Sequence, residues 1–371
     1  MKYAYGLLLS AFSLFVLSEL EEITVINSKW LFLPSVDQIE EEEIYLLNSH
    51  HLKELLNLSS GVWISRGSGQ ENLISLRSPV LTGSGACGSF QITEDGIPIR
   101  PAGFCNVNNL FEISANLASQ VEVIKGPSSA MFGGNSLHGL INIKSLEPKD
   151  TNDIFFQIDK NESLRSRILL RNSSNTLLGF ELDRDKGFRN QTGFDQQKMV
   201  IKNYGSFRDW SLQTLINFTN LNQETAGYIN SYFFPTRIIN ANPEAYRDAK
   251  SLRIKTEISK NLDALDISLT PYMRFSSMNF IQHYLPGQPI EKNGQKSAGL
   301  FFNILGFKIN NNSFGIGSQI EFAHVNLDQY QPDVLNSSNS FNNAVRPQGF
   351  HYDFEVKTNL IASYISHEFE S

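Results

Sequence analysis

The feature that most constrains the fold is an alternation of apolar and polar residues in the second half of the chain. It is clearest over 252–259, where Leu, Ile, Thr and Ile point to one side and Arg, Lys, Glu and Ser to the other. Segments 154–159 and 265–275 alternate in the same way. A strand with this pattern has one face on lipid or protein and the other on water or a polar filling. A membrane barrel and a β-sandwich both give such strands, so the alternation alone leaves both folds open.

The connections between strands distinguish the two folds. About ten strands are predicted between 152 and 367 from the two-residue period and the turn signals. After a first hairpin at Lys160–Ser163, short and long connections alternate. The short ones are Asn172–Asn175, Tyr204–Ser206, Lys260–Leu262 and Asn310–Asn312, and the long ones are Arg184–Gln196, Asn220–Lys250, Ser276–Ser297 and Asn326–His351. Outer-membrane barrels have short periplasmic turns and long external loops, and a sandwich has no reason to keep this order. The sequence therefore favours a barrel wall.

Composition narrows the possible functions. The 371 residues are enough for two domains, and a formal net charge of −7 argues against a nucleic-acid-binding protein. The chain has no recognisable nucleophile–base pair, paired catalytic acids or metal-ligand spacing. An enzyme is therefore disfavoured, including a secreted β-rich hydrolase, and neither a metal site nor a cofactor is expected.

The first 18 residues are interpreted as a signal peptide. Lys2 provides the positive start, and the mostly apolar run 3–17 is shorter than the about 20 residues that a membrane helix needs. A buried N-terminal strand or an uncleaved anchor is the alternative. Export would place Cys87 and Cys105 in an oxidising compartment, where a bridge worth about 3 kcal/mol is expected. Two free buried thiols are the alternative.

The segment 34–148 mixes helix and strand signals. Four consecutive glutamates at 40–43 are interpreted as a solvated face, and His50 and His51 as the surface of a short helix that ends at Leu56. Asp95 and Gly96 between β-prone segments predict a hairpin turn. The stretch 120–144 predicts a strand, a helical turn after a proline, a glycine-rich turn and a second strand.

Several of these stretches resemble one family. Val121-Glu-Val-Ile-Lys-Gly-Pro-Ser-Ser-Ala-Met-Phe-Gly133, Gly139-Leu-Ile-Asn-Ile143 and Asp95-Gly-Ile-Pro98 are similar to motifs of TonB-dependent outer-membrane receptors. The residues that match the plug motif are Lys125, Gly126, Pro127, Phe132, Gly133, Gly139 and Asn142. The resemblance implies an α+β plug domain over 34–148, followed by all-β antiparallel transmembrane β-barrel strands over 149–371.

The resemblance also implies a function and a location. Such a receptor lies in the outer membrane of a Gram-negative cell, among its lipids, and takes up a scarce ligand such as a ferric siderophore, cobalamin or haem. TonB and its inner-membrane complex supply the energy. Residues 19–33 would hold the TonB-binding segment, at Glu22, Ile23, Thr24, Val25 and Ile26. The expected ligand contacts are Arg77, Arg100, Asn106, Asn108, Tyr228 and Tyr232. A surface-binding or adhesion barrel that does not transport is the alternative.

The number of strands departs from the family pattern. Plugged transporters have 22 strands, and about ten fit this chain. The chain ends at Glu368-Phe-Glu-Ser371 without the usual terminal aromatic strand end. An open sheet edge in lipid would leave backbone groups unpaired. The chain is therefore expected to be a fragment or a truncated gene product that forms no functional closed pore by itself.

Overall fold

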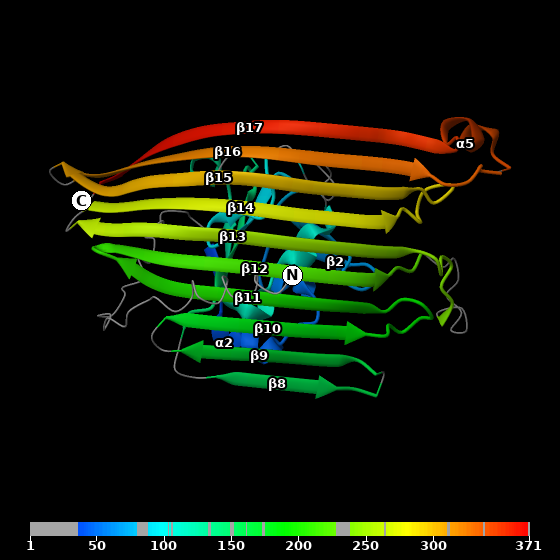
Figure 1. The fold of residues 1–371 in the computed structure, drawn as a ribbon, viewed down its shortest axis with the longest axis horizontal. Helices are drawn as coiled ribbons and strands as arrows, with labels where there is room; N and C mark the ends of the chain where they lie inside the picture. The colour runs from blue at the N-terminus through cyan, green and yellow to red at the C-terminus, as the bar shows by residue number, and fades with distance from the viewer. Residues whose placement is uncertain are drawn as a thin grey trace, which may run out of the picture.

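The computed structural model describes residues 36–79, 88–102, 104, 107–132, 135–148, 152–160, 162–172, 175–227, 238–262, 265–309, 312–336 and 338–369. These residues form two parts, here called the N-terminal unit (36–148) and the wall sheet (153–369). In Figure 1 the strands of the wall sheet lie in front, and the N-terminal unit lies behind them. The predicted fold class, an α+β part followed by antiparallel barrel-type strands, is confirmed.

The wall sheet consists of ten strands, each antiparallel to the strand that follows it in sequence. They are β8 (Asp153–Ile158), β9 (Leu164–Asn172), β10 (Thr176–Asp185), β11 (Phe194–Phe207), β12 (Trp210–Glu224), β13 (Tyr246–Leu262), β14 (Leu265–Ile281), β15 (Ile290–Ile309), β16 (Asn312–Gln331) and β17 (Gly349–Phe369). A short helix, α5 (Ser340–Val345), lies in the last connection. Among the described strands, β8 and β17 are the two edges of the sheet.

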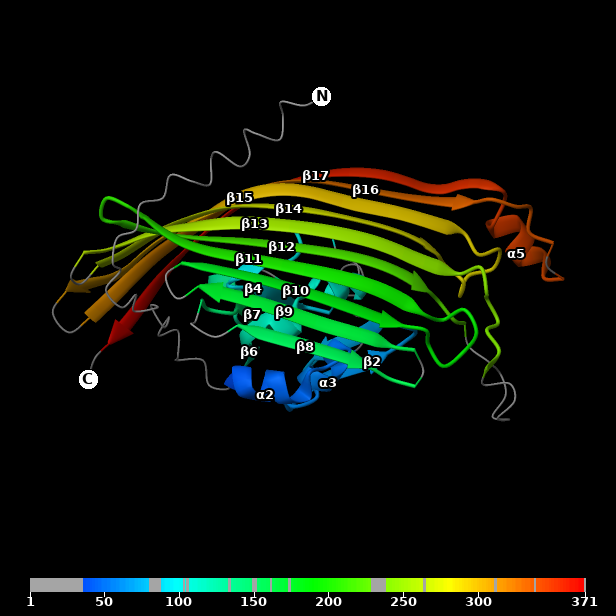
Figure 2. The same cartoon turned by 60° about the horizontal axis from the view of Figure 1, so that its bottom comes forward.

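The two faces of the wall sheet differ in polarity as the alternation predicts. In β16, Ile316 and Phe322 are 53% and 60% exposed, whereas Gln319 and Glu321 are buried against the interior. Figure 2 shows the sheet curving over the N-terminal unit, so the buried polar side chains lie on its concave side. No helix in the described ranges is long and apolar enough to cross a membrane.

The predicted positions of several connections were wrong. Tyr204–Ser206 lies inside β11, which turns only at Arg208 and Asp209, and Lys260–Leu262 lies inside β13. The long connections are also shorter than predicted: they cover 186–193, 225–245, 282–289 and 332–348. The strands continue through polar residues, because the hydrogen bonds between neighbouring strands are made by backbone N–H and C=O groups and do not require apolar side chains.

The N-terminal unit is built on a five-stranded sheet in the order β1-β6-β7-β4-β5, in which only β4 and β7 are parallel. Its elements are β1 (Val36–Glu40), α2 (Glu41–Leu47), α3 (Leu52–Leu56), β2 (Val62–Arg66), β3 (Asn72–Leu76), β4 (Phe90–Glu94), β5 (Ile97–Pro98), η2 (Val107–Glu112), η3 (Ala115–Leu117), β6 (Ala118–Lys125), α4 (Ser129–Phe132) and β7 (Gly139–Ser145). Val121, Val123, Ile141 and Ile143 of the central strands form its core with Leu55 of α3.

The glutamates at 40–43 have more specific contacts than a solvated face. The backbone N–H of Glu40 donates to Glu43 Oε2 at 3.0 Å, and Glu40 is the N-cap residue of α2. This is a capping box, which satisfies N–H groups that a helix start leaves unpaired. Glu41 contacts Arg171 of the wall sheet at 3.4 Å. These glutamates therefore begin helix α2 and also contact the wall sheet.

Candidate functional site

The 125–139 segment leaves and re-enters the sheet at neighbouring positions. Lys125 at the end of β6 pairs with Gly139 at the start of β7. Gly139 has φ +142°, and a Cβ there would lie 2.1 Å from Ile124 O and 2.7 Å from Leu76 Cδ2. Only glycine fits this combination of backbone angle and crowding. Its place against Leu76 also brings the end of β3 next to the motif.

Lys125 ties three segments together. Its ammonium group pairs with Asp37 of β1 and donates to Ser60 Oγ at 2.9 Å. Ser59 Oγ donates to the same Asp37 carboxylate at 2.7 Å. The hydrogen bond from Lys125 is the main reason that the pKa of Asp37 is lowered. This basic position of the motif therefore holds the first described strand against the sheet.

Asn142 has an equivalent role on the other side of the sheet. Its Oδ1 accepts from Thr93 Oγ1 at 2.8 Å and from Gly96 N at 2.9 Å, and its Nδ2 donates to Glu122 Oε2 at 2.9 Å. Asp95 and Gly96 both have positive φ, as the predicted hairpin turn requires. Lys125, Gly139 and Asn142 are thus structural residues whose side chains or backbone fix the shape of the N-terminal unit.

The contact between the N-terminal unit and the wall sheet is rich in ion pairs. The pairs with the acid on the N-terminal unit are Glu41–Arg171 (3.4 Å), Glu71–Arg247 (2.6 Å), Glu94–Arg253 (3.0 Å), Glu112–Arg253 (2.9 Å), Asp95–Lys255 (3.2 Å) and Glu147–Lys202 (2.6 Å). Burial alone would raise the pKa of Asp95, but Lys255 and Lys202 lower it to about 2. Asp95 is therefore ionised at neutral pH.

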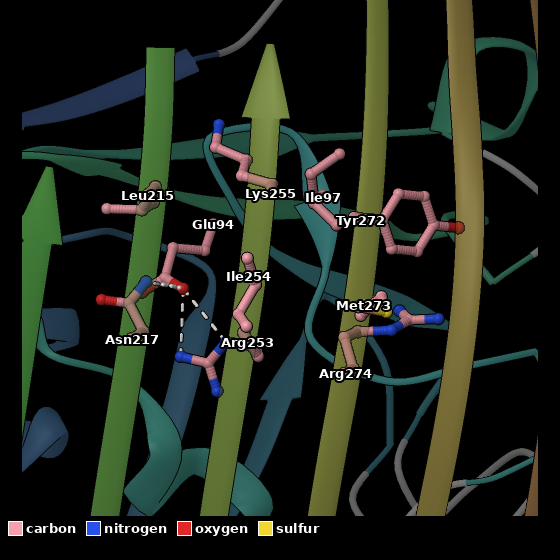
Figure 3. A pocket seen from close by; sticks show the side chains of 10 residues that line it. All are labelled: Glu94, Ile97, Leu215, Asn217, Arg253, Ile254, Lys255, Tyr272, Met273 and Arg274. Carbon is pink, nitrogen blue, oxygen red and sulfur yellow. Dashed lines mark hydrogen bonds and ion pairs between the residues drawn. The ribbon is translucent and has the colours of Figure 1, made fainter. Parts of the chain in front are cut away.

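Arg253 of β13 binds two acids of the N-terminal unit, and Figure 3 shows its pair with Glu94. Its guanidinium group binds Glu94 and Glu112 and also donates to Glu112 O at 3.0 Å, while Asn217 Nδ2 donates to Glu94 at 2.6 Å. Burial raises the pKa of Glu112 to about 7, against the opposing effect of Arg253 and Arg100. The adjoining cavity measures about 20 Å³, which is room for a water molecule rather than a ligand.

Arg274 holds the segment that follows β5. Its Nη1 donates to Pro98 O at 2.5 Å and to Arg100 O at 2.8 Å, and its Nη2 pairs with Glu321 of the wall sheet at 2.5 Å. The N–H of Ala102 donates to the same glutamate at 3.3 Å. The wall sheet therefore fixes this segment by its backbone, whatever its side chains are.

The expected ligand contacts are only partly placed by the structure. Arg77 is exposed and follows β3 with φ +47°, and its N–H donates to Gly61 O at 2.9 Å. Arg100 is half-buried, and burial lowers its pKa to about 10 while Glu112 opposes the shift. The backbone of Asn108 lies in η2. The remaining expected residues that lie outside the described residues are Glu22, Ile23, Thr24, Val25, Ile26, Cys87, Cys105, Asn106, Gly133, Tyr228 and Tyr232. All of these assignments stay predictions.

The interpretation of His51 as helix surface was wrong. It is 3% exposed and is the N-cap of α3: its Nδ1 accepts from Lys53 N at 3.0 Å, and its Nε2 lies 3.2 Å from Glu71 O. His50, one residue earlier, points elsewhere and contacts Asp183 of the wall sheet at 3.2 Å. The sequence gives little sign of this, because Asn48 and Ser49 are commoner caps than histidine.

His51 is expected to make the N-terminal unit sensitive to acid. Burial, with Arg66 as a further cause, lowers its pKa from 6.5 to about 4. Because the unfolded chain then binds the proton more tightly, stability is complete above pH 6.5 and falls by about 3 kcal/mol as the pH drops to 4. Hydrogen exchange of the α3 amides at pH 7 and pH 4 measures this loss. His51→Asn, which keeps a capping side chain, should remove it, and an unchanged loss in that variant would contradict the assignment.

Comparison with known proteins gives a consistent picture. Residues 32–140 match the family model "TonB-dependent Receptor Plug Domain". The chain is 25% identical over 200 residues to the vitamin B12 transporter BtuB of Vibrio vulnificus, covering 49% of this chain and 31% of that protein. The ferric citrate transporter FecA in its unliganded form has a TM-score of 0.73 at 14% identity, covering 91% of this chain and 54% of that one. FpvA of P. aeruginosa bound to heterologous pyoverdines has a TM-score of 0.70 at 14% identity, with coverages of 92% and 50%. The chain thus spans about a third to a half of the length of these relatives.

Proposed function

We propose that this chain, which belongs to the TonB-dependent outer-membrane receptors, serves to bind a scarce external ligand and to import it with energy relayed by TonB. The observation that carries the proposal is the N-terminal unit seated on the polar, concave face of the wall sheet. The similarity to transporters for vitamin B12 and ferric citrate supports a ferric siderophore or cobalamin as the class of ligand.

The contact between the two parts supports an energised mechanism. Six carboxylates of the N-terminal unit are paired with wall cations, and most of these groups are buried. A ligand that passes along this face has to separate some of these pairs, and each separation gives up charge-assisted hydrogen bonds that hold the two parts together. An external source of work, rather than ligand binding alone, therefore fits the structure.

TonB is the proposed source of this work. The sequence Glu22–Ile26 is a short β-prone segment that ends ten positions before β1 begins, and an extended segment of this kind can pair with the edge of a partner sheet. Strand β1 is held to the core by the Lys125–Asp37 pair, so a pull on the preceding segment reaches the sheet of the N-terminal unit directly.

The proposal predicts that uptake depends on this segment. The complete gene product is expressed in cells that lack other receptors of this class, and uptake of radiolabelled ferric siderophores and cobalamin is measured. Thr24→Pro should reduce uptake to the level of cells without the gene, because proline removes a backbone donor from the pairing strand. Binding at 4 °C, where no energy is supplied, should remain.

The conservative variant Thr24→Ser is the matched control and should take up the ligand as the unmodified protein does. If Thr24→Pro leaves uptake unchanged, TonB is not engaged through this segment. If the complete protein binds a ligand but never imports it, the non-transporting surface-binding barrel is the better interpretation.

A further inference from the structure

The outer face of the wall sheet, which points away from the N-terminal unit, carries an apolar band. Met273 of β14, Phe322 of β16 and Ile361 of β17 lie in it, with exposed fractions of 45%, 60% and 78%. In a membrane barrel a band of this kind lies against the acyl chains of the lipids. The two borders of the band are therefore at the level of the lipid head groups.

Basic side chains border the apolar band on the side of the long connections. Lys296 of β15 pairs in register with His324 of β16, and His324 with Lys357 of β17, so the three residues are direct neighbours across three strands. These three residues form a basic row. Phe322 of the band is two positions from His324 on the same strand and on the same face. Because the long connections of outer-membrane barrels are external, this border of the band is the one at the outer leaflet.

Positive charge is concentrated next to the band, although this end of the outer face is balanced as a whole. Besides the basic row, the charged outer-face residues of the described strands β13 to β17 at this end are Lys250 and Glu355, one step farther from the band, and Asp248, Lys292, Asp328 and Asp353, two steps farther. One step is two residues along a strand, or about 7 Å. Four lysines and four carboxylates thus balance at this end, but the row nearest the band contains only basic side chains.

The protein compensates the basic row only in part. Glu355 Oε1 lies 2.7 Å from His324 Nε2 and 3.7 Å from Lys357 Nζ. Among the described residues, no carboxylate is at ion-pair distance from Lys296. Like charges that face each other directly across a sheet destabilise it. An anion with several oxygen atoms at this border of the band would offset that repulsion.

We propose that the basic row binds the phosphate of a phosphorylated lipid in the outer leaflet, and that the acyl chains of this lipid lie along the apolar band. Ammonium groups bind phosphate oxygens through charge-assisted hydrogen bonds, and a lysine at the border of the band can cover apolar surface with its methylene groups. A lipid fits this surface better than free phosphate, because the basic row and the band adjoin on β15, β16 and β17. The inference rests on the outer-membrane location that the proposed function implies, and it adds a partner for the outer face.

The test uses the complete gene product, purified in a non-ionic detergent and freed of bound lipid. Lys296→Gln with Lys357→Gln removes two positive charges from the basic row. Lys260→Gln with Lys308→Gln is the matched control, because it removes two lysines from the other ends of β13 and β15, next to short connections. Lys296→Arg with Lys357→Arg keeps both charges of the basic row in place.

Binding is measured by native mass spectrometry with three probes: lipid A, which is a phosphorylated glycolipid, the same lipid without its phosphates, and inorganic phosphate. We expect the unmodified protein to bind lipid A, and the glutamine variant of the basic row to bind it about tenfold more weakly. The control variant and the arginine variant should bind it as the unmodified protein does. Removing the phosphates from the lipid should weaken binding to a similar extent, and inorganic phosphate should not displace lipid A.

Three outcomes would overturn the inference. Equal affinity of the glutamine variant and the unmodified protein for lipid A would show that the basic row does not hold the phosphate. Equal binding of the lipid without phosphates would assign the binding to the apolar band alone. Displacement of lipid A by inorganic phosphate would indicate a site for free phosphate instead of a lipid. If the glutamine double variant is not assembled, Lys296→Gln alone provides the same comparison with one charge.

These outcomes are distinguishable from a failure of the proposed function, because the binding measurement involves neither TonB nor an imported ligand. A protein that binds lipid A through the basic row but never imports a ligand would contradict the proposed function alone. A protein that imports its ligand but binds lipid A equally well with and without the two lysines would contradict only the inference.

Discussion

Gly139→Ala is expected to prevent β7 from pairing correctly with β6 and to unfold the N-terminal unit. The added Cβ would lie 2.1 Å from Ile124 O and 2.7 Å from Leu76 Cδ2, and φ at this position is +142°. A backbone oxygen of a paired strand cannot move aside as a flexible side chain does. Strain and overlap together should cost roughly 4 kcal/mol or more. Protease resistance and hydrogen exchange of the β7 amides measure the loss.

Gly126→Ala is the matched control for this prediction. Gly126 also has positive φ, at +125°, but a Cβ there would meet nothing within 4 Å. The free energy of unfolding should fall only by the cost of holding alanine at this backbone angle, about 1–3 kcal/mol. If the two alanine variants are equally stable, crowding by Ile124 and Leu76 is not what requires glycine at position 139.

Arg253→Met is expected to loosen the N-terminal unit from the wall sheet by about 3–5 kcal/mol. The change leaves Glu94 and Glu112 buried without their shared cation, at 7% and 1% exposure. The urea concentration at which the N-terminal unit becomes susceptible to protease should fall. The triple variant that adds Glu94→Gln and Glu112→Gln should recover most of the loss, because neutral amides carry a smaller desolvation cost than carboxylates.

Lys250→Met tests whether the effect comes from the pairing rather than from any change on β13. Lys250 lies on the same strand with its side chain on the outer face. This variant should leave the urea dependence unchanged. A triple variant as unstable as Arg253→Met alone would show that the shape of the arginine, rather than the two carboxylates, accounts for the loss.

The alternation of side chains was enough to predict the wall, because a strand period of two is a local property. Arg253, Lys255 and Ile254 lie on the faces that the pattern assigns to them. The strand ends were not predictable in this way. Tyr204 and Lys260 lie in polar stretches that suggest turns, yet Tyr204 pairs with Gln213 of β12 and Lys260 with Ile267 of β14. Where a strand ends depends on its partner strand, which the local sequence does not contain.

The contacts of the candidate site were harder to predict from the sequence than the strands of the wall sheet. The resemblance identified Lys125 and Asn142 as motif residues, but their partners Asp37 and Glu122 became known only from the fold. The wall cations were missed because their carboxylates are distant in sequence; Arg253 and Glu94 are 159 residues apart. The available signal was the run of basic residues on the polar side of the alternation, which indicates that something acidic faces it.

The polar contact between the two parts also determines how they can separate. An apolar contact between the two parts would expose apolar surface to water when it opens, and the free-energy cost would grow with the exposed area. Here each carboxylate and each ammonium or guanidinium group that parts from its partner can be hydrated at once, and water replaces the lost hydrogen bonds one by one. The ion pairs thus align the two parts specifically in the closed state. Separation also exposes apolar surface, but only in two clusters that contain Phe111 or Leu117 and Leu146 from the N-terminal unit, among the described residues.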